Sequence, residues 1–556
     1  MDDISETEFP WWKKTVVYQI YPRSFYDSNG DGIGDLKGII SKLDYIQDLG
    51  IETIWFSPFF KSPKQDIGYD ITDFYGIDPQ YGDMKLNDKL IDEIHKRDMK
   101  IVLDLVLNHT SDQHPWFIES RSSRDNPKRD WYIWADGKRK NKPPTNWHSM
   151  IGGSGWQYDE KTEQWYWCQF LPFQPDLNYY NSEVKKEMFD MVRFWLRKKI
   201  DGFRLDIVDA ICKDPSLRNN PFSLTFMPSD TSIKRFFRNS IYNLDHPDTF
   251  EFVKELRSVM DEFDNPQRFL VGEVITKETS ARRYCGGDNV DGLHSVFLFR
   301  TLRTKHSAKK FRNLIEIFEE NLKEPHIPTW VFSNHDRMRR ISRLGNDISM
   351  AKLHAAFQLT VRGVPYIYYG EEIGMESPRM IVKESIDEMA LKYKWIPQIA
   401  FDFVRKIAIE SFNREEQRTP MQWNSSPNAG FCPADVKPWL PVPQSYKERN
   451  VESELNDPDS LLNCYKRFLK ARNENPALKS GSIDILNLKK VSKDILGYIR
   501  RSSKQVVYVY LNFGNNNHKF KSPIVNGKIL ASTNLNKKQI QKEKIQLGPQ
   551  EGIVII

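Results

Sequence analysis

Three carboxylates stand at the ends of short apolar runs, where they could act together. Asp206 closes GFRLD, Glu273 closes LVGE and Asp336 closes FSNHD. Arg204 precedes the first of these acids by two residues, and His335 stands directly before the last. Carboxylic acids that lie close together shift one another's pKa values, so that one stays ionised while another carries a proton. Such a set suits cleavage of a glycosidic bond through an oxocarbenium-like transition state.

Eight runs rich in β-branched and aromatic residues recur from residue 16 to about residue 375, in the order VVYQI, TIWFSP, KIVLDLV, DGFRLDI, RFLVGEV, SVFLFR, TWVFSN and VPYIYYG. Between them lie segments such as 36–50 and 182–199, whose apolar residues follow a helical spacing. This alternation predicts a (β/α)8 barrel built on a parallel sheet. Because the carboxyl ends of the strands meet at one rim of such a barrel, it would bring the three acids together.

Each of these acids, taken alone, has a second interpretation. A buried acid paired with a neighbouring arginine or a helix N-terminus is as good an explanation as catalysis for any one of them. The third strand, however, ends with Asp104, Asn108 and His109 in the same manner. Three acids with two histidines and an arginine on one rim therefore favour a catalytic site.

The remaining segments indicate additional domains. About 70 residues rich in Trp, Pro, Gly and charge follow LVLNH, too many for a plain connection. We expect an inserted domain at 109–178 within a barrel made of 1–108 and 179–478, and a second insertion at about 377–432. From 479 to 556 apolar and polar residues alternate in short runs, which are separated by turns such as GNNN and VNGK. This pattern predicts an all-β sandwich domain.

The composition excludes several classes of partner. The 556 residues include 81 Lys and Arg against 75 Asp and Glu, a formal net charge of +6 without a long run of one sign. We therefore expect no nucleic-acid partner. The N-terminus MDDISETEFPWWKK lacks the pattern of a signal peptide, and no apolar run approaches the ~20 residues that span a bilayer, so we expect a cytoplasmic protein without a membrane partner. The sequence leaves monomer and dimer open.

The 5 cysteines are scattered and show no CxxC pair. We expect neither a disulfide framework nor a zinc site, and interpret them as buried free thiols.

The stretch DSNGDGIGD has the chemistry of a cation loop. Asp27, Asn29, Asp31 and Asp35 supply hard oxygens at alternate positions, and the backbone carbonyl of Ile33 could complete the set. This ligand type predicts Ca²⁺, with Mg²⁺ as the smaller alternative, in a structural role because the loop precedes the first barrel helix. The competing interpretation is a loop held by Asx turns without a metal.

Several motifs make the family recognisable. WWKKTVVYQIYPRSF, DIGYDITDF, DLVLNH, FQPDLN, GFRLDIVD, LVGEV, FSNHD, RTPMQW and ELNDPDSLLNCY occur in this order over nearly the whole chain. The sequence resembles the α-amylase superfamily, glycoside hydrolase family 13, and within it the oligo-1,6-glucosidase and α-glucosidase group. Relatives in that group bind a cation in the loop that matches DSNGDGIGD.

The resemblance implies roles for the three acids. Asp206 resembles the nucleophile that forms a covalent glucosyl ester, with Arg204 keeping it ionised. Glu273 resembles the acid that protonates the departing oxygen and later activates water, which needs a pKa raised toward neutrality. Asp336 resembles the residue that binds the 2- and 3-hydroxyls of the distorted sugar. A retaining enzyme of this kind would release the α-anomer.

The substrate-binding residues are implied in the same way. His109 and His335 resemble the histidines that contact glucose hydroxyls, and Tyr69 resembles the aromatic platform under the ring. Asp66 and Arg418 resemble the pair that grips the 4-hydroxyl and closes the pocket, although Ile67 stands where the family often has Asn. A closed pocket implies that a terminal glucose is removed.

The linkage is left open. Gln174 of FQPDLN is typical of the oligo-1,6-glucosidase group, and Ile207 resembles the Val of relatives that prefer α-1,6 bonds. The segment KDPSLRNNPFS instead resembles a loop of α-glucosidases that act on short α-1,4 substrates. Arg337 and Met338 stand where many relatives have Gln-Pro, so acceptor choice and glucosyl transfer are also open.

We expect an exo-acting, retaining α-glucosidase acting on maltose-type substrates, isomaltose or sucrose. The nearest alternative is oligo-1,6-glucosidase; trehalose-phosphate hydrolase and sucrose or trehalose isomerases are further ones. The non-enzymatic alternative is a silent barrel such as the ectodomain of amino-acid transporter heavy chains. Those proteins have a membrane span and have usually lost active-site acids, whereas this sequence keeps all three.

Overall fold

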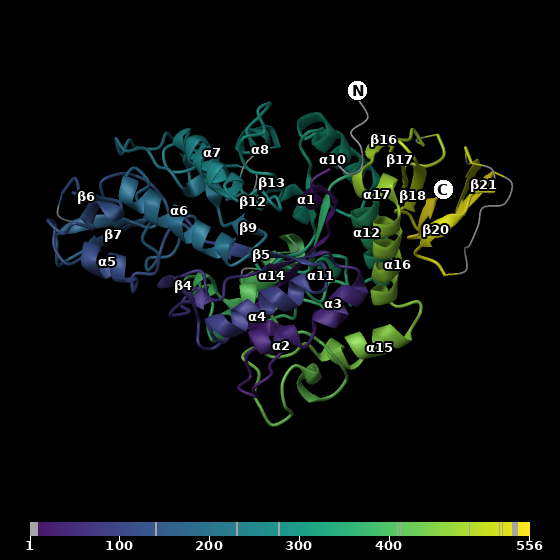
Figure 1. The fold of residues 1–556 in the computed structure, drawn as a ribbon, viewed down its shortest axis with the longest axis horizontal. Coiled ribbons are helices and arrows are strands. Elements are labelled where there is room, and N and C mark those ends of the chain that lie inside the picture. Colours follow the sequence, from purple (N-terminus) through teal and green to yellow (C-terminus); the bar gives the residue numbers. More distant parts are fainter. Residues whose placement is uncertain are drawn as a thin grey trace.

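The centre of the molecule is a parallel sheet that curls into a nearly closed barrel (Figure 1). The computed structural model describes residues 9–139, 142–229, 232–275, 278–408, 410–411, 413–488, 490–521, 523–524, 526–535 and 543–556. In order around the barrel its strands are β13 (Ser295–Phe297), β12 (Phe269–Glu273), β9 (Gly202–Leu205), β5 (Lys100–Leu105), β2 (Thr53–Phe56), β1 (Val17–Ile20), β15 (Val364–Tyr368) and β14 (Thr329–Val331). Thr329 Oγ1 donates to the Val296 carbonyl at 2.8 Å and so joins the two end strands. The predicted (β/α)8 barrel is confirmed.

The strands read as continuous apolar runs because both of their faces are covered. Apart from Lys100, every residue of the eight strands is buried. Successive side chains of β1 alternate: Val17 packs inside the barrel with Trp55, whereas Tyr18 belongs to the layer beneath the helices. Burial on two sides is what a parallel sheet with crossover helices requires.

The helices that cover the barrel follow the strands in turn (Figure 1). They are α2 (Leu36–Ile40) with α3 (Leu43–Leu49), α4 (Met84–His95), α6 (Ser182–Arg197), α7 (Asp248–Asp261), α8 (Glu278–Tyr284), α10 (Ala308–Asn321), α12 (Ile348–Thr360) and α16 (Leu461–Glu474). In α6 the Asn181 side chain accepts from the backbone N–H of Glu183 and caps the helix start. Its buried face carries Val184, Met188, Val192 and Trp195, the three-to-four spacing of an amphipathic helix.

An insertion projects from the carboxyl end of β5, on the left of Figure 1. It contains α5 (Pro115–Ser120) and a three-stranded antiparallel sheet of β6 (Trp134–Ala135), β8 (Gln164–Trp167) and β7 (Trp156–Asp159). A backbone bridge between His109 and Asp176 fastens its two ends to each other, and a second bridge joins Tyr132 to Leu177. The end that carries His109 therefore has a fixed position above the barrel.

Two further segments rise from the same rim. The connection after β9 includes the small hairpin β10 (Lys234–Arg235) and β11 (Arg238–Asn239), and the segment after β15 includes α13 (Glu388–Leu391) and α14 (Gln398–Ala408). Tyr393 Oη donates to the Ile151 carbonyl at 2.6 Å, which links the last segment to the insertion after β5.

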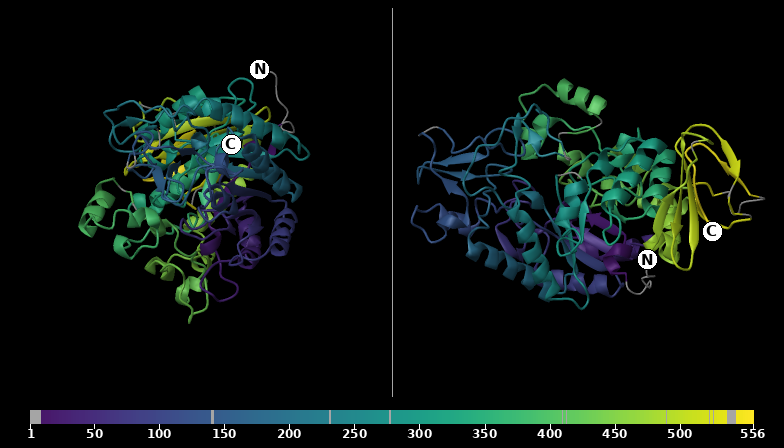
Figure 2. Two further views of the ribbon diagram at one scale, coloured as in Figure 1. Left: turned by 90° about the vertical axis from the view of Figure 1, so that its left-hand side faces the viewer. Right: turned by 90° about the horizontal axis from the view of Figure 1, so that it is seen from above.

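The C-terminal part is an antiparallel β-structure at the opposite end of the molecule from the insertion (Figure 2). One sheet contains β16 (Ser482–Ile485), β17 (Ile495–Arg501), β18 (Val506–Asn512), β22 (Gly552–Ile555) and β20 (Ile529–Ser532), and a ribbon contains β19 (His518–Lys521) and β21 (Lys544–Leu547). Ile495 and Tyr510 of the sheet share a core with Ile545 and Leu547 of the ribbon. The predicted all-β sandwich is confirmed.

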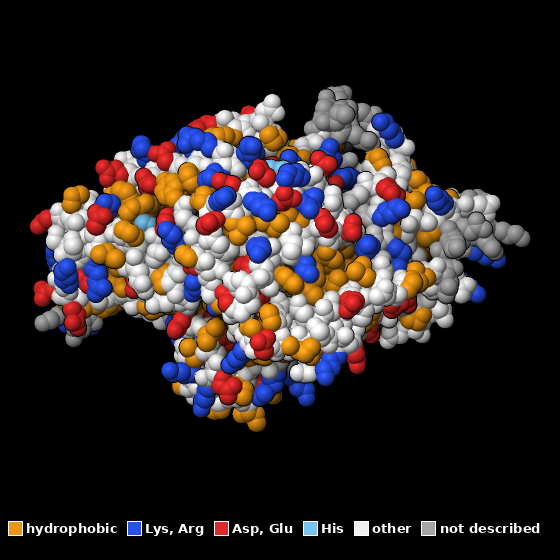
Figure 3. All heavy atoms as spheres, turned by 60° about the horizontal axis from the view of Figure 1, so that its bottom comes forward, with side chains coloured by type: hydrophobic (Ala, Val, Ile, Leu, Met, Phe, Trp, Pro, Cys, Tyr) orange, Lys and Arg blue, Asp and Glu red, His pale blue; other side chains and the backbone are white. Residues whose placement is uncertain are grey.

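The surface and the cysteines agree with the composition. All 5 cysteines are buried and free, as predicted. On the face shown in Figure 3, Lys and Arg side chains are interspersed with Asp and Glu. Among the described residues, no helix combines the length and apolar character needed to cross a membrane.

Candidate active site

The barrel brings the predicted catalytic acids to one rim. Asp206 directly follows β9, Glu273 is the last residue of β12, and Asp336 lies in the loop after β14. Because all eight strands are parallel, these ends lie on the same side of the sheet. Asp104, inside β5, pairs in register with Arg204 of β9 and adds a fourth carboxylate below them.

One arginine connects three of these carboxylates. Arg204 Nη1 donates to Asp104 Oδ1 and to Asp206 Oδ1, each at 2.8 Å. Its other amino group, Nη2, contacts Glu273 Oε2. The Arg204 side chain is 1% exposed, so little water screens these interactions. Asp206 and Glu273 are therefore close neighbours on a single guanidinium group.

Burial and charge act in opposite directions on these acids. Burial raises the pKa of Asp104 to about 7, and the positive charge of Arg204 partly offsets that rise. Burial also raises the pKa of Asp206, again opposed by Arg204. In turn, the neighbouring carboxylates raise the pKa of Arg204 against the effect of its own burial, so it stays charged. The cation is thus what allows Asp206 to ionise in a buried site.

His335 has a defined tautomer. Gln19 Nε2 donates to His335 Nδ1 at 2.9 Å, so the ring proton of the neutral imidazole is on Nε2. That atom lies 2.7 Å from Tyr69 Oη and 3.1 Å from Asp336 Oδ2. Burial lowers the pKa of His335 to about 3, although Asp336 opposes this. At neutral pH His335 therefore presents an N–H donor and no charge.

Tyr69 and His109 complete this wall of the site. The Tyr69 ring stacks on the His335 ring with centroids 5.4 Å apart, and Tyr69 Oη donates to Asp104 Oδ2 at 3.1 Å. His109 Nε2 donates to the Tyr69 carbonyl at 3.1 Å, and its ring lies 5.4 Å from that of Phe170. The predicted residues Tyr69, His109 and His335 thus form one hydrogen-bonded group.

Asp336 is the most exposed of the three acids, and its surroundings favour its ionised form. Its side chain is 31% exposed, against 13% for Asp206 and 8% for Glu273. Arg418 Nη2 donates to Asp336 Oδ1 at 2.8 Å. Burial alone would raise the pKa of Asp336, but its neighbours His335, Arg418 and Arg414 lower it below its ordinary value. Asp336 is therefore an ionised acceptor that a ligand can reach.

Arg414 is a site residue that the sequence analysis missed. The resemblance pairs Asp66 with Arg418, but in the structure Arg414 Nη2 donates to Asp66 Oδ1 at 2.6 Å while Arg418 binds Asp336. Arg414 Nη1 also lies 3.7 Å from Asp336 Oδ1. The signal was present, since Arg414 stands four residues before Arg418 in REEQRTPMQW.

Two further buried groups fix Arg414 and Asp66. Asp387 accepts hydrogen bonds from the Arg414 guanidinium, the shortest from Nε to Oδ2 at 3.0 Å and from Nη2 to Oδ1 at 2.6 Å. Burial would raise the pKa of Asp387, and Arg414 instead holds it below the ordinary value. Gln174 Nε2 donates to Asp66 Oδ2 at 2.9 Å. Three rim segments therefore converge beside Asp336 and close that side of the site.

In the predicted cation loop, side-chain carboxylates accept hydrogen bonds from the loop's own backbone. Asp27 accepts from the backbone N–H groups of Asn29, Gly30 and Gly32 at 2.7 to 3.0 Å, and Asp31 Oδ1 accepts from Ile33 at 2.9 Å. Among the described residues, no group of three His, Cys, Asp or Glu is placed to hold a metal ion. A carboxylate has about four lone-pair positions, so an oxygen that accepts an N–H can still bind a cation. Asp27, Asn29, Asp31, Ile33 and Asp35 thus have the chemistry for Ca²⁺ in a loop already held by Asx turns.

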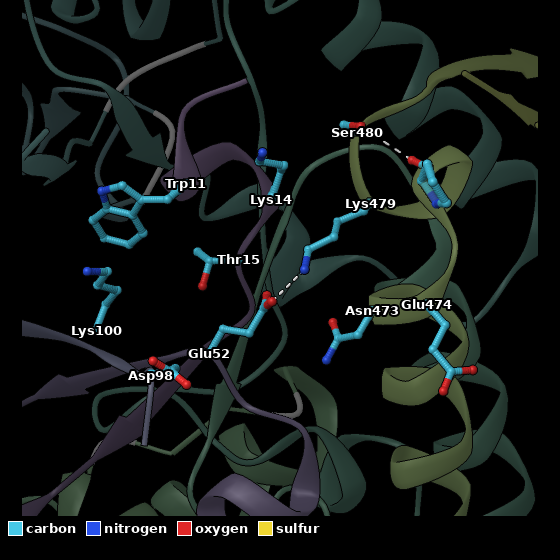
Figure 4. A pocket seen from close by; sticks show the side chains of 11 residues that line it. Trp11, Lys14, Thr15, Glu52, Asp98, Lys100, Asn473, Glu474, Lys479 and Ser480 are labelled. Carbon is cyan, nitrogen blue, oxygen red and sulfur yellow. Dashed lines mark hydrogen bonds and ion pairs between the residues drawn. The ribbon is translucent and has the colours of Figure 1, made fainter. Parts of the chain in front are cut away.

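A separate cavity of about 380 Å³ lies at the other end of the barrel (Figure 4). It lies between the N-terminal segment, the starts of β2 and β5, and the end of α16; its lining includes Trp11, Lys14, Glu52, Asn473 and Lys479. Lys479 Nζ donates to Glu52 Oε1 at 2.5 Å. None of the predicted site residues lines this cavity.

Comparisons with known proteins agree with this fold and site. The family model for the α-amylase catalytic domain matches residues 19–481. An oligo-1,6-glucosidase of Parageobacillus thermoglucosidasius is 38% identical over 98% of both chains. A probable alpha-glucosidase of Rhizobium meliloti (strain 1021) is 38% identical over 92% of this chain and 90% of the relative. The crystal structure of a trehalulose synthase from Pseudomonas mesoacidophila MX-45 is 33% identical, covers 98% of this chain and 99% of its own, and has a TM-score of 0.87. The chain belongs to the α-amylase family.

Proposed function

We propose that the chain is an exo-acting, retaining α-glucosidase that hydrolyses terminal non-reducing α-linked glucose from short oligosaccharides. The observation that carries this proposal is the contact of one buried guanidinium, that of Arg204, with both Asp206 and Glu273. Two carboxyl groups held this close suit a nucleophile and an acid that act in turn on one anomeric carbon. The relatives named as glucosidases support the same reaction.

The steps can be assigned to residues. Asp206 attacks the anomeric carbon while Glu273 donates its proton to the leaving oxygen, and a glucosyl ester on Asp206 results. Glu273, now ionised, takes a proton from a water that attacks the same carbon and releases Asp206. Positive charge develops on the sugar ring in both transition states, and the carboxylates of Asp206, Asp336 and Asp104 stabilise it.

The cluster beside Asp336 supports action on a chain end. Asp66 comes from the connection after β2, whereas Arg414 and Asp387 come from the segment after β15; ion pairs of 2.6 Å join Arg414 to both acids. We infer that this cluster blocks a sugar chain that would extend beyond a terminal glucose. The polar atoms of Asp66 and Arg418 remain our predicted ligands for its 4-hydroxyl.

The proposed function leaves two alternatives for the linkage that is cleaved, α-1,4 and α-1,6. Oligo-1,6-glucosidase is the alternative, and two relatives with that name support it. Ile207, directly after the nucleophile, has a φ of 32°, a costly conformation for a β-branched residue that fixes the course of the chain there. A sugar acceptor that attacks the glucosyl ester on Asp206 in place of water would give glucosyl transfer.

The function is tested by incubating the purified protein with maltose, isomaltose, sucrose and trehalose and measuring glucose release. We expect hydrolysis of at least one of the first three, and absence of glucose from all four contradicts the proposal. Proton NMR of the first product separates the mechanisms, since a retaining enzyme releases α-glucose and an inverting one β-glucose.

We further propose that the loop 27–35 binds a structural Ca²⁺, with Mg²⁺ as the alternative. Hard oxygens at alternate positions and the left-handed φ of Gly30 (81°) and Gly32 (85°) support a tight ligand loop. The ion would stabilise the loop and take no part in the reaction. A cytoplasmic location is proposed as well, supported by 5 buried cysteines that are all free.

A further inference from the structure

One side of helix α14 is apolar and exposed. Ile399, Phe403 and Ile407 recur every four residues and therefore lie on one side of the helix. Their exposed fractions are 78%, 64% and 66%, and Trp395, in the turn before the helix, is 76% exposed. Exposed apolar side chains normally occur singly, whereas a row of them marks an interaction surface. These four residues are called the apolar row below.

The opposite side of α14 is bonded to the rest of its segment. Phe401 is buried and packs in a small core with Val382. Arg405 Nη2 donates to the Ser377 carbonyl at 2.6 Å. These contacts fix the rotation of the helix about its axis, so the apolar row stays on the outside.

The position of the apolar row suits a large partner. In both views of Figure 2 the green segment that carries α13 and α14 projects from the body of the molecule. Sites for small molecules are concave, whereas the surface of a helix is convex. The row therefore suits a macromolecule better than a small ligand.

The exposed area of the row is close to what a specific dimer needs. Typical side-chain areas put the exposed surface of its four residues at roughly 500 Å² per molecule. A pair of rows would thus bury about 1,000 Å², the lower limit for a specific interface. Ala400 is exposed beside the row and, being small, lets a facing helix approach closely.

A second copy of the chain is a partner that matches this row. In a two-fold symmetric pair each molecule contributes the same patch, so the patch must be complementary to itself. Two antiparallel α14 helices meet this condition. The end of one helix, with Trp395, then lies beside the end of the other, with Ile407, and a ring packs against an aliphatic side chain at both ends of the pair.

A lipid surface matches the helix less well. Amphipathic helices that bind membranes have a polar face rich in Lys and Arg. The charged residues of α14 are Asp402, Arg405 and Lys406. Asp402 accepts two hydrogen bonds of 2.8 Å from Arg379, and Arg405 contacts Glu416. Two of these three charges are thus already paired within the molecule.

We propose that the apolar row of Trp395, Ile399, Phe403 and Ile407 pairs with the same row of a second copy of this chain, so that the protein is a two-fold symmetric dimer through α14. The composition left monomer and dimer open. Dimerisation of this kind does not depend on the proposed enzyme activity.

Sedimentation velocity of the full chain tests the pairing. Between about 0.1 and 100 µM, the range expected for a small interface, the wild type should change from one chain of 65.5 kDa to a species of twice that mass. I399K/F403K should stay monomeric throughout, because pairing would remove water from the charged side chains. Its circular dichroism spectrum should match that of the wild type, since both positions are exposed.

Two controls locate the interface. L224K changes an 88% exposed apolar position in the connection after β9 and should leave the dimer intact. A400C keeps the whole apolar row, and a short bis-maleimide should cross-link this variant into a covalent dimer. The wild type should give no cross-link, because its 5 cysteines are all buried.

A wild type that stays monomeric at the highest of these concentrations overturns the inference, as does an I399K/F403K variant that still dimerises. Dissociation by L224K in place of I399K/F403K means that the interface lies in the connection after β9, which also overturns it. Sedimentation with vesicles of phosphatidylglycerol and phosphatidylcholine tests the lipid alternative. Binding of a monomeric wild type that is lost in I399K/F403K means that a lipid surface occupies the row instead.

Discussion

The Arg414 guanidinium lies 2.6 Å from the Asp66 carboxylate, although 348 residues separate the two in the chain. Asp66 belongs to the connection after β2, and Arg414 to the segment after β15. The same guanidinium holds the buried Asp387. One side chain thus fixes two distant parts of the rim beside Asp336.

Replacement of Arg414 by methionine should therefore affect both stability and binding. Asp387 would be left buried without its cation, which costs about 3–5 kcal/mol of unfolding free energy. R414M/D387N should recover the part of that loss that comes from Asp387 in urea unfolding, whereas the buried Asp66 still lacks its cation. We expect KM for maltose to stay high in the double variant, and a KM restored to the wild-type value would show that Arg414 serves only the fold.

Asp206 should be indispensable for turnover. D206N removes the nucleophile and keeps the side-chain shape, so kcat for any α-glucoside should fall by at least about 10⁴-fold. The circular dichroism spectrum should remain that of the wild type. Near-normal activity in this variant would identify another nucleophile.

Gln19 should influence catalysis by fixing the tautomer of His335. Q19M removes the donor to Nδ1, so the ring proton is no longer confined to Nε2 and the N–H toward Asp336 is partly lost. A hydrogen bond to an ionised acceptor contributes about 1.5–3 kcal/mol, so its partial loss should lower kcat/KM by about tenfold. Nitrogen NMR of labelled histidine reads the tautomer directly, and a wild-type tautomer combined with wild-type kinetics would refute this role.

The buried Glu371 should make stability fall with increasing pH. Burial raises its pKa to about 7 from the ordinary 4.5, although hydrogen bonds from Ser333 and Tyr465 oppose the rise. Between these values the unfolded chain ionises while the folded one stays protonated, so this stabilising contribution is complete below pH 4.5 and lost as the pH rises through 7. The loss is on the order of 3 kcal/mol.

E371Q should remove that part of the pH dependence. Urea unfolding at several pH values between 4.5 and 8 measures the difference between the variant and the wild type. Parallel curves for the two proteins would show that Glu371 does not titrate in this range.

The cation loop yields a separate prediction. If Ca²⁺ binds at 27–35, EDTA should lower the melting temperature by several degrees and added Ca²⁺ should restore it, because a ligand bound only to the folded state stabilises it. D31A should abolish the response of the melting temperature to Ca²⁺. In EDTA its melting temperature should differ from that of the wild type only by the small effect of losing one Asx turn. An EDTA-insensitive wild type would favour the metal-free loop.

The sequence was sufficient for the barrel because a parallel sheet buried on two faces leaves a strong pattern. Each of the eight predicted runs contains an observed strand, and the strand-end rule placed Asp206, Glu273 and Asp336 on one rim. What it could not supply was the pairing between rim segments. Arg414 is surrounded by charged residues in the sequence, and only the folded chain shows that it meets Asp66 and Asp387.

Gln19 and the Phe236–Phe237 turn were missed for different reasons. Gln19 lies within an apolar strand and looks like an isolated polar residue, whereas its donor faces a histidine 316 residues away. The turn breaks the usual residue preference for its φ values, so no propensity rule predicts it. Local rules fail here because tertiary contacts impose the conformation.

The pairing of β1 with both β2 and β15 sets a condition on how the protein is made. Val17 lies in register with Thr53 on one side and with Tyr366 on the other. At ~5–20 residues per second, a ribosome needs on the order of half a minute to deliver β15 after β1 has emerged. During that interval β1 has an open edge that can recruit strands from other chains. Yield in a cell should therefore depend on the factors that shield nascent chains, even though β1 has a partner on each side in the finished barrel.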